Sequence, residues 1–225
     1  MITVCVTVFN RSRLEYAGRA LTLFPNLVRS LRASAERLGE EVELCVSDWG
    51  STDWPLAEWL PGLWKGRLTI REIRHLEKFS VGHGKNVAAE HASGDILLFA
   101  DADMLVPDDY LTLVKDVCGG GVALFPVYWR NDGSEAAFWS HEEWGAKVGR
   151  RGFWGKGHGN AAVPRDVFAQ TGGWPVKFSY GGEDSDFQRA VRRYCEVRRD
   201  RVRGLVHQWH PKAPGEVEVG RVSRT

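Results

Sequence analysis

The tripeptide Asp101-Ala102-Asp103 is the feature of this sequence whose chemistry is easiest to recognise. It follows the apolar run 96–100, which is typical of a strand buried on both faces. In an extended backbone residues i and i+2 face the same side, so both carboxylates would point together. Convergent carboxylates at the carboxyl end of a strand favour a hard divalent cation, Mg²⁺ or Mn²⁺. The structural alternative is a pair of solvated turn aspartates ahead of the next helix.

A second acidic cluster consists of Glu183, Asp184 and Asp186, which follow two glycines at the predicted start of a helix. Helix N-termini favour carboxylates electrostatically, so capping alone could account for these residues. A carboxylate beside a bound metal ion and a hydroxyl substrate could instead act as a general base, provided that it lies within hydrogen-bond reach.

Two histidines, His207 and His210, follow a predicted apolar strand near the C-terminal end of the sequence. One neutral imidazole could complete the ligand shell of a metal ion bound by the aspartates. A surface histidine, or one hydrogen-bonded in the core, is the alternative for either position.

Two further segments suit a nucleotide. Asp48 and Ser51 lie in a turn-rich stretch after a strand, where a carboxylate could accept from a base N–H, although an Asx turn is the simpler interpretation. Lys85 lies in a glycine-flanked loop that passes into a helix, a position suited to a diphosphate. Neither a GxxxxGK[ST] loop nor a GxGxxG in a Rossmann setting is present.

Strands and helices alternate along the chain in the order typical of a doubly wound α/β sheet. Strands are predicted at 2–9, 42–47, 68–73, 95–100, 122–127, near 197 and at 202–207, and helices at 16–38, 82–91, 110–117, 165–170 and 183–194. Within 16–38, Pro25 is a second candidate for the helix start. The stretch 129–159 lacks periodicity and is predicted to be a loop that closes over a ligand.

Composition favours an ordinary globular domain. The 225 residues are 43% hydrophobic and 26% charged, and 30 Lys+Arg balance 29 Asp+Glu, so no global field attracts nucleic acid or a charged membrane. The four scattered cysteines are expected to be reduced thiols. No apolar run has the length of a membrane span and the first residues do not resemble a signal peptide, so a cytoplasmic protein without a transmembrane segment is expected.

The order of these motifs resembles a GT-A glycosyltransferase close to family 2, with a C-terminal part similar to the β-1,4-galactosyltransferase type. The motifs are a strand followed by Asn10-Arg11, then Asp48–Asp53, Gly82–Asn86, Asp101–Asp103, Gly172–Trp174, Gly181-Gly-Glu-Asp184 and His207–Pro211. The resemblance implies a single α/β domain over 1–225, Rossmann-like and doubly wound, with a mostly parallel central sheet and a small C-terminal hairpin on the acceptor side. Residues 1–106 would bind the nucleotide-sugar and 107–225 the acceptor.

The resemblance also implies roles for particular residues. Asp184 would be the catalytic base. Asp103 would bind the metal ion directly, with Asp101 beside it and His207 as the first choice of histidine ligand ahead of His210. The donor would contact Thr7, Phe9, Asn10, Arg11, Asp48, Ser51, Lys85, Asp101, Ala102 and Asn160. The acceptor would contact Glu183, Trp154, Gly182 and His210.

The implied activity is metal-dependent, inverting transfer of a hexose from a nucleoside-diphosphate sugar, UDP-sugars first, to an acceptor hydroxyl. Asp rather than an amide at position 184 favours inversion. Two alternatives stay open: a sugar-1-phosphate nucleotidyltransferase, although 1–13 lacks the glycine-rich basic loop, and a catalytically silent carbohydrate-binding domain. Seven arginines between Arg189 and Arg203 form either a solvated face or a site for an anionic acceptor, namely a glycan, a lipid-linked phosphate or a nucleic acid.

Overall fold

A computed structural model describes residues 1–16, 18–74, 78–130, 153–156, 159–178, 182–199, 205–208 and 210–211. For residues 19, 127–130 and 153–156 the description is limited to the backbone.

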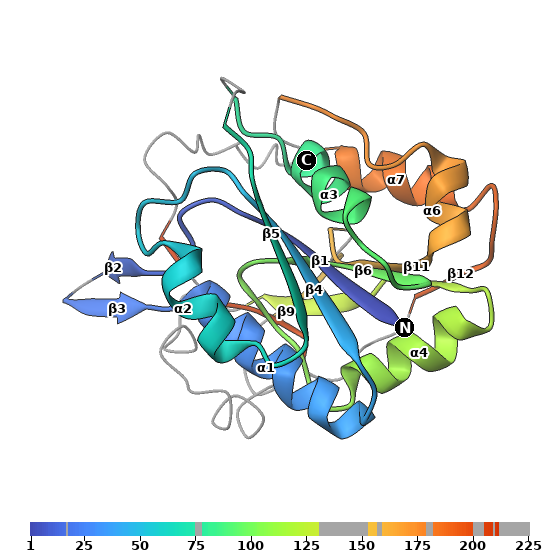
Figure 1. The fold of residues 1–225 in the computed structure, drawn as a ribbon. Coiled ribbons are helices and arrows are strands. Elements are labelled where there is room, and N and C mark those ends of the chain that lie inside the picture. Colours follow the sequence, from blue (N-terminus) through green and yellow to red (C-terminus); the bar gives the residue numbers. More distant parts are fainter. Residues whose placement is uncertain are drawn as a thin grey trace.

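A seven-stranded sheet forms the centre of the molecule, in the order β12-β8-β11-β6-β1-β4-β5 (Figure 1). Four neighbouring strands are parallel: β1 (Ile2–Val8), β4 (Val42–Asp48), β5 (Arg67–Glu72) and β6 (Ile96–Asp101). β11 (Ala161–Pro164) runs antiparallel between β6 and β8 (Ala123–Leu124), and β12 (Val197–Arg198) is parallel to β8. The sheet is therefore mostly parallel, which confirms the predicted α/β fold.

Helices cover both faces of this sheet (Figure 1). One face packs against α1 (Leu23–Leu38), α2 (Leu56–Leu63) and α4 (Tyr110–Gly119), and the other against α3 (Val81–Glu90), α6 (Arg165–Thr171) and α7 (Glu183–Val191). Because side chains alternate along a strand, Val4 and Val6 enter the first core while Cys5 between them enters the second. Every residue of β1 and β4 is buried, which explains why apolar residues occur on both faces of each strand.

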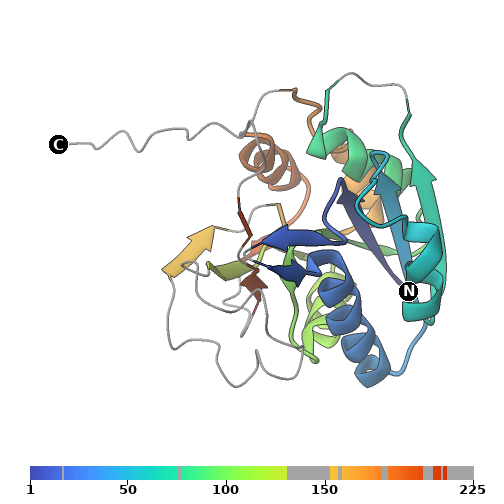
Figure 2. The same ribbon diagram turned by 90° about the vertical axis from the view of Figure 1, so that its left-hand side faces the viewer.

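A second, four-stranded sheet has the order β10-β9-β13-β7, with β7 at Met104–Leu105, β9 at Val127–Arg130, β10 at Phe153–Lys156 and β13 at Val206–His207. In Figure 2, β10 (yellow) and β5 lie on opposite sides of the molecule. His207 pairs with Met104 in the antiparallel β13–β7 ladder, so this sheet brings the C-terminal histidines to the end of β6. Among the described residues no helix is both long and apolar enough to cross a membrane.

Two sequence predictions are corrected here. The helix expected from Tyr16 begins at Leu23, because 14–21 instead forms a hairpin of β2 (Leu14–Tyr16) and β3 (Arg19–Leu21), where Gly18 adopts a left-handed φ of 73°. Pro25 is thus in the first helical turn, where a missing N–H costs nothing. The C-terminal hairpin is wrong for the described strands, since β12 and β13 join different sheets through partners distant in sequence.

The predicted closing loop and the predicted division of the chain at residue 106 remain predictions. The closing loop at 129–159 lies mostly outside the described residues, apart from the ends that form β9 and β10. The functional division at residue 106 is also untested, although strands from both sides of that point complete the same central sheet.

Gly84 allows α3 to approach β1 closely, because a Cβ at this position would lie 2.0 Å from the Thr7 hydroxyl oxygen and 2.8 Å from its Cβ. We expect Gly84→Ala to lower the free energy of unfolding by about 1–3 kcal/mol, as is typical of overpacking. The matched control is Gly119→Ala in α4, where a Cβ would meet nothing within 4 Å and the better helix propensity adds up to about 1 kcal/mol. Urea denaturation measures the free energy of unfolding of both variants. An equal change in the two would contradict the close packing of α3 on β1.

Candidate active site

A turn at the end of β6 carries the two predicted metal-binding aspartates. Asp101 is the last residue of β6, and Ala102 and Asp103 form a turn before β7. The predicted extended geometry is therefore wrong, because the chain must bend here to leave the central sheet for the second sheet. As a result the two carboxylates have different partners.

Asp101 is held by residues from two other segments. One carboxylate oxygen lies 3.0 Å from the Lys85 ammonium, and the other accepts from Asn160 Nδ2 at 3.0 Å. Asn160 also accepts from the Asp101 backbone N–H at 3.0 Å. Gly159 is close enough that a Cβ there would lie 2.7 Å from the Asp101 carboxylate. The carboxylate of Asp101 is thus fixed in orientation and neutralised.

Lys85 is fully buried. Besides Asp101, its ammonium donates to the Gly159 carbonyl at 2.6 Å and lies 4.3 Å from the centre of the Trp174 ring. A buried ammonium needs such partners, because the loss of its hydration is otherwise uncompensated. The predicted contact of Lys85 with a donor diphosphate stays a prediction.

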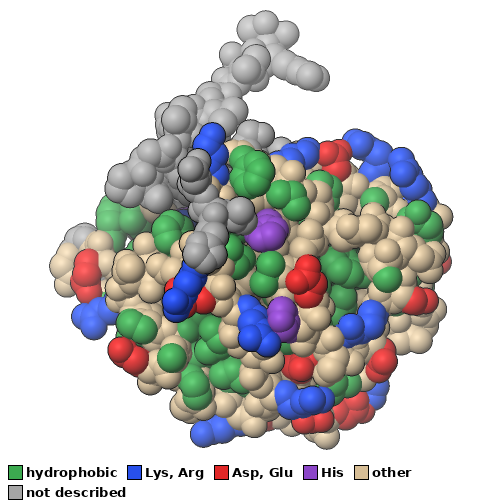
Figure 3. All heavy atoms as spheres, turned by 45° about the horizontal axis from the view of Figure 1, so that its top comes forward, with side chains coloured by type: hydrophobic (Ala, Val, Ile, Leu, Met, Phe, Trp, Pro, Cys, Tyr) green, Lys and Arg blue, Asp and Glu red, His purple; other side chains and the backbone are tan. Residues whose placement is uncertain are grey.

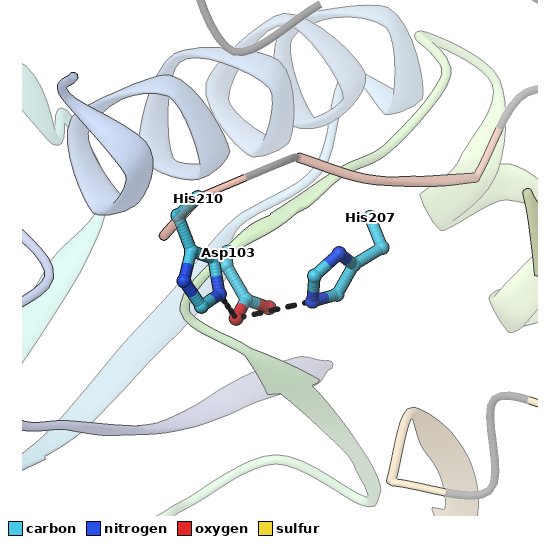
Figure 4. A group of neighbouring side chains, drawn as sticks. All are labelled: Asp103, His207 and His210. Atoms are coloured by element: carbon cyan, nitrogen blue, oxygen red, sulfur yellow. Dashed lines mark hydrogen bonds and ion pairs between the residues drawn. The ribbon is translucent and has the colours of Figure 1, made fainter. Parts of the chain in front are cut away.

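Asp103 faces two imidazoles (Figure 4). Its Oδ2 lies 3.1 Å from His210 Nε2 and 3.4 Å from His207 Nε2. Burial would raise the pKa of Asp103, but the interactions with His207 and His210 outweigh it and hold the pKa well below the usual range. The ligand atoms of the three residues lie within 4.8 Å of one another, so they could hold a metal ion, whereas Asp101 is not part of this group.

Gln208 positions the histidines, and the sequence interpretation missed it. Its backbone N–H donates to the Asp103 carbonyl at 2.8 Å. Its buried side-chain amide donates to the Leu23 carbonyl at 3.0 Å and accepts from Asn26 at 3.0 Å. The only signal in the sequence was a polar residue between two histidines, which does not show that it is buried.

Asp184 lies in the first turn of α7, after Gly182, which adopts a left-handed φ of 90°. The pKa of Asp184 is raised to about 6, mainly by burial; the positive charge of Lys85 lowers this pKa, and the negative charges of Asp101 and Glu183 raise it. Asp184 is therefore within electrostatic reach of the Lys85–Asp101 pair. The neighbouring Glu183 has a buried carboxylate oxygen without a hydrogen-bond partner in the described part of the chain.

The loops after β1 and β4 are tied together by side chains that were predicted to bind the donor. The Asn10 side chain accepts from the Thr52 N–H at 2.8 Å, and the Asn10 N–H donates to Ser51 at 3.0 Å. Asp48 accepts from the Ser51 N–H at 2.9 Å, which is the hydrogen bond of the Asx turn that the sequence indicated. Asn10 has a φ of 49°, which suits an asparagine in a turn.

An aromatic group lies beside these loops. Phe9 and Phe79 stack with ring centroids 5.9 Å apart, and both are more than 40% exposed. Trp49 packs edge-on against Phe79 at 5.1 Å and donates to the Thr7 hydroxyl at 3.1 Å. The structure therefore brings Thr7 and Phe9 to one rim of the sheet, with exposed ring faces suited to a flat base.

The remaining predicted residues are more scattered. Arg11 donates to the Asn10 carbonyl at 3.2 Å, and Ala102 is buried in the core. Trp154 lies in β10 opposite Trp129, in a strand described by its backbone alone. Arg192 and Arg193 are exposed after α7, and Figure 3 shows side chains of both signs interspersed over the face it presents. The roles assigned to these residues stay predictions.

One family of known proteins matches most of this chain. The family model described as Glycosyl transferase family 2 matches residues 3–173. No curated protein sequence matches the chain significantly.

Solved structures share the fold at low sequence identity. The structure of S. aureus TarS 1-349 in complex with UDP-GlcNAc has a TM-score of 0.68 and 15% identity, covering 94% of this chain and 59% of TarS 1-349. The mannosyltransferase PcManGT from Pyrobaculum calidifontis, in complex with GDP-Man and Mn²⁺, has a TM-score of 0.56 and 21% identity over 92% and 56% of the two chains. The structure of M. tuberculosis glucosyl-3-phosphoglycerate synthase in complex with Mn²⁺ and UDP-glucose has a TM-score of 0.56 and 18% identity. The match covers 93% of this chain and 72% of the synthase chain. This chain thus spans less than two thirds of TarS 1-349 and of PcManGT.

The buried ammonium of Lys85 predicts a large loss of stability when it is removed. We expect Lys85→Met to lower the free energy of unfolding by about 2–4 kcal/mol, because it leaves the Asp101 carboxylate without its cation. Lys177→Met is the control, since Lys177 pairs with Asp186 at the surface and should cost less than about 1 kcal/mol. Denaturant unfolding of both variants tests this, and a similar loss in each would refute a special role for the buried cation.

The raised pKa of Asp184 predicts that its carboxylate destabilises the ligand-free protein above about pH 6. The rise of this pKa from the ordinary 3.8 to about 6 corresponds to a loss of roughly 3 kcal/mol in the free energy of unfolding. This loss is absent below pH 4 and is complete once Asp184 is ionised in the folded protein. Asp184→Asn should therefore raise the free energy of unfolding by about 1–3 kcal/mol at pH 8, with a smaller gain at pH 5.

Asp186→Asn is the control for this pH dependence. The hydrogen bond from Lys177 lowers the pKa of Asp186, so its stabilising contribution is present above about pH 4 and lost as the pH falls. Its replacement should therefore not stabilise the protein at pH 8. Chemical denaturation at pH 5 and pH 8 measures both variants. A loss of stability in Asp184→Asn at pH 8 would show that the ionised carboxylate does not destabilise the folded protein.

Proposed function

This chain belongs to glycosyl transferase family 2, and on that premise we propose that it transfers a sugar from a nucleoside-diphosphate sugar to an acceptor hydroxyl group. The observation that carries the proposal is the convergence of Asp103, His207 and His210 beside the end of β6, with Asp184 near the Lys85–Asp101 pair. A cation site and a base with a raised pKa are the two groups that such a transfer needs.

The residues at Asp103 fit a divalent cation, Mn²⁺ or Mg²⁺. Asp103 Oδ1 is buried and has no hydrogen-bond partner among the described residues, and its Oδ2 faces two imidazole nitrogens. An acceptor oxygen buried without a donor suits a bound cation. Asp103, His207 and His210 would hold the ion, and Asp101 would lie beside it. When bound, the cation would stabilise the negative charge of the diphosphate leaving group.

The donor nucleotide is proposed to lie across the loops after β1 and β4. Exposed Phe9 offers a ring face, Asn10 joins the two loops through its bonds to 51 and 52, and Asp48 fixes the turn of the second loop through its bond to 51. A preorganised rim of this kind costs little rearrangement on binding. UDP-sugars are our first choice, because two of the similar structures contain UDP-GlcNAc or UDP-glucose.

Asp184 is proposed to remove the proton from the acceptor hydroxyl. A base with a pKa of about 6 is ionised at neutral pH yet retains affinity for a proton, which is the balance that general-base catalysis requires. Attack from the face opposite the leaving group inverts the anomeric carbon. Glu183, Gly182 and Trp154 are proposed to contact the acceptor, as in the galactosyltransferase type that the Gly-Gly-Glu-Asp segment resembles, whereas His210, for which the sequence also predicted an acceptor contact, is proposed as a ligand of the ion.

The test is sugar transfer from a panel of UDP- and GDP-sugars in the presence of Mn²⁺, with NMR to assign the anomeric configuration of the product. We expect Asp184→Asn to retain donor binding by calorimetry and to lose transfer by roughly 10²–10⁴-fold. Asp186→Asn, in the same helical turn but paired with Lys177 and Arg189, is the control and should remain active. Binding of no nucleotide-sugar would refute the function, and full activity of Asp184→Asn would refute the base.

A further inference from the structure

Two exposed arginines lie beside Gln188, one helical turn beyond the proposed base. Gln188 follows Asp184 by four residues in α7, so the two residues lie on the same side of the helix, about 6 Å apart along its axis. The Arg192 N–H donates to the Gln188 carbonyl at 3.1 Å, which continues the helical geometry past Val191. Arg199 follows β12, and its guanidinium donates to Gln188 Oε1 at 2.6 Å. Two cations from different segments therefore share one flank of α7.

The direction of β12 brings Arg199 to the catalytic edge of the central sheet. β12 is parallel to β8, β8 is antiparallel to β11, and β11 is antiparallel to β6. β12 and β6 therefore run in the same direction, and the residues that end or follow them, Asp101 and Arg199, lie at the same edge. Open α/β sheets bind their ligands outside this edge. Arg199 is thus on the side of the molecule where sugar transfer is proposed to occur.

Gln188 has a hydrogen-bond donor that the described protein atoms do not satisfy. The bond from Arg199 fixes the orientation of the Gln188 amide, because a guanidinium can only donate and must face the amide oxygen. Gln188 is only 5% exposed, and its Nε2 has no hydrogen-bond partner among the described residues. A buried donor without an acceptor is costly. This flank of α7 therefore holds an excess of donors, two of them charged.

The charges of Arg192 and Arg199 are not neutralised within the part of the chain that the structure describes. Both side chains are exposed, and neither forms an ion pair with a described carboxylate. Arg189 and Lys177, by contrast, both pair with Asp186, at 2.9 and 2.6 Å. The helix dipole favours a cation in the last turn and accounts for Arg192, but not for Arg199, which lies outside the helix. An anionic partner from outside the chain accounts for both.

The geometry of two guanidinium groups favours a phosphate as that partner. A guanidinium presents a planar fork of N–H donors that matches two oxygens of a carboxylate or a phosphate. One fork occupies both oxygens of a carboxylate. A phosphate keeps further oxygens for a second guanidinium, so it suits a site with two arginines.

We propose that Arg192, Arg199 and Gln188 form a binding site for a phosphate group of the acceptor. This inference rests on the proposed function, in which the start of α7 contacts the acceptor. It adds that the acceptor bears a phosphate one to two helical turns, about 6–12 Å, from the hydroxyl group that Asp184 deprotonates. A soluble phosphate ester and a lipid headgroup share this chemistry.

The experiment is a titration of the metal-free, ¹⁵N-labelled full chain with inorganic phosphate, followed by NMR of the arginine Nε–H groups at constant ionic strength. We expect phosphate to shift the signals of Arg192 and Arg199, which are assigned by their loss in Arg192→Gln and Arg199→Gln. Either substitution should weaken phosphate binding about tenfold, as is typical of a lost hydrogen bond to a charged group. Arg193→Gln is the matched control, because Arg193 is also exposed but its N–H bonds to Ala190 instead of Gln188, and it should change the affinity less than about twofold.

Two further measurements separate the form of the site and the source of the phosphate. Arg199→Lys keeps the charge without the fork and should retain only part of the affinity. Co-sedimentation with phosphatidylglycerol vesicles, but not with phosphatidylcholine vesicles, that is lost in Arg199→Gln would identify a lipid headgroup. Phosphate binding without vesicle binding would identify a soluble phosphate ester.

Three outcomes overturn one of the two proposals. If phosphate shifts neither arginine signal, or if all three Arg→Gln variants lose affinity equally while circular dichroism shows them folded, the cluster is a solvated face and the phosphate site is refuted. If phosphate binds as expected but no nucleotide-sugar binds, the proposed function is refuted and the phosphate site stands.

Discussion

The buried ammonium of Lys85 is the interaction on which the arrangement of this site depends. An ion without water must be surrounded by partners, and Lys85 has the Asp101 carboxylate, the Gly159 carbonyl and the face of Trp174. These partners come from the end of β6 and from segments before β11 and α7, so one charge fixes three parts of the chain against α3. Gly159 is required because any Cβ would enter the Asp101 carboxylate.

Three carboxylates near this edge of the sheet have three different environments. Asp101 is neutralised by Lys85, Asp103 is turned toward two imidazoles, and Asp184 is buried near other negative charges. The first environment orients a side chain, the second favours a cation and the third favours a proton. Such a separation of environments is how one acidic site supports both electrostatic and proton-transfer chemistry. The turn at Ala102 allows it, since it prevents the two neighbouring aspartates from sharing one partner.

Strands that are buried on both faces were the most predictable part of the fold. β1 and β4 were predicted to within one residue at each end, because a short segment rich in apolar residues and bounded by turn residues is typical of a buried strand. α2 was missed since Pro61 and Gly62 near its end obscure the helical pattern. The two-residue strand β7 was missed because it forms through pairing with β13 and has no period of its own, whereas the strand predicted at 202–207 includes β13.

The sequence by itself determined the chemical types and their order: a carboxylate pair after an apolar strand, an acidic helix start and two late histidines. Tertiary structure decided which of them meet. His207 and His210 reach Asp103 rather than Asp101, and Lys85 is buried against Asp101. Lys85 and Gly159 are 74 positions apart along the chain, and Asp103 and His210 are 107 apart. Periodicity and local propensity describe neighbours within a few residues, whereas contacts over such separations follow from strand order and burial.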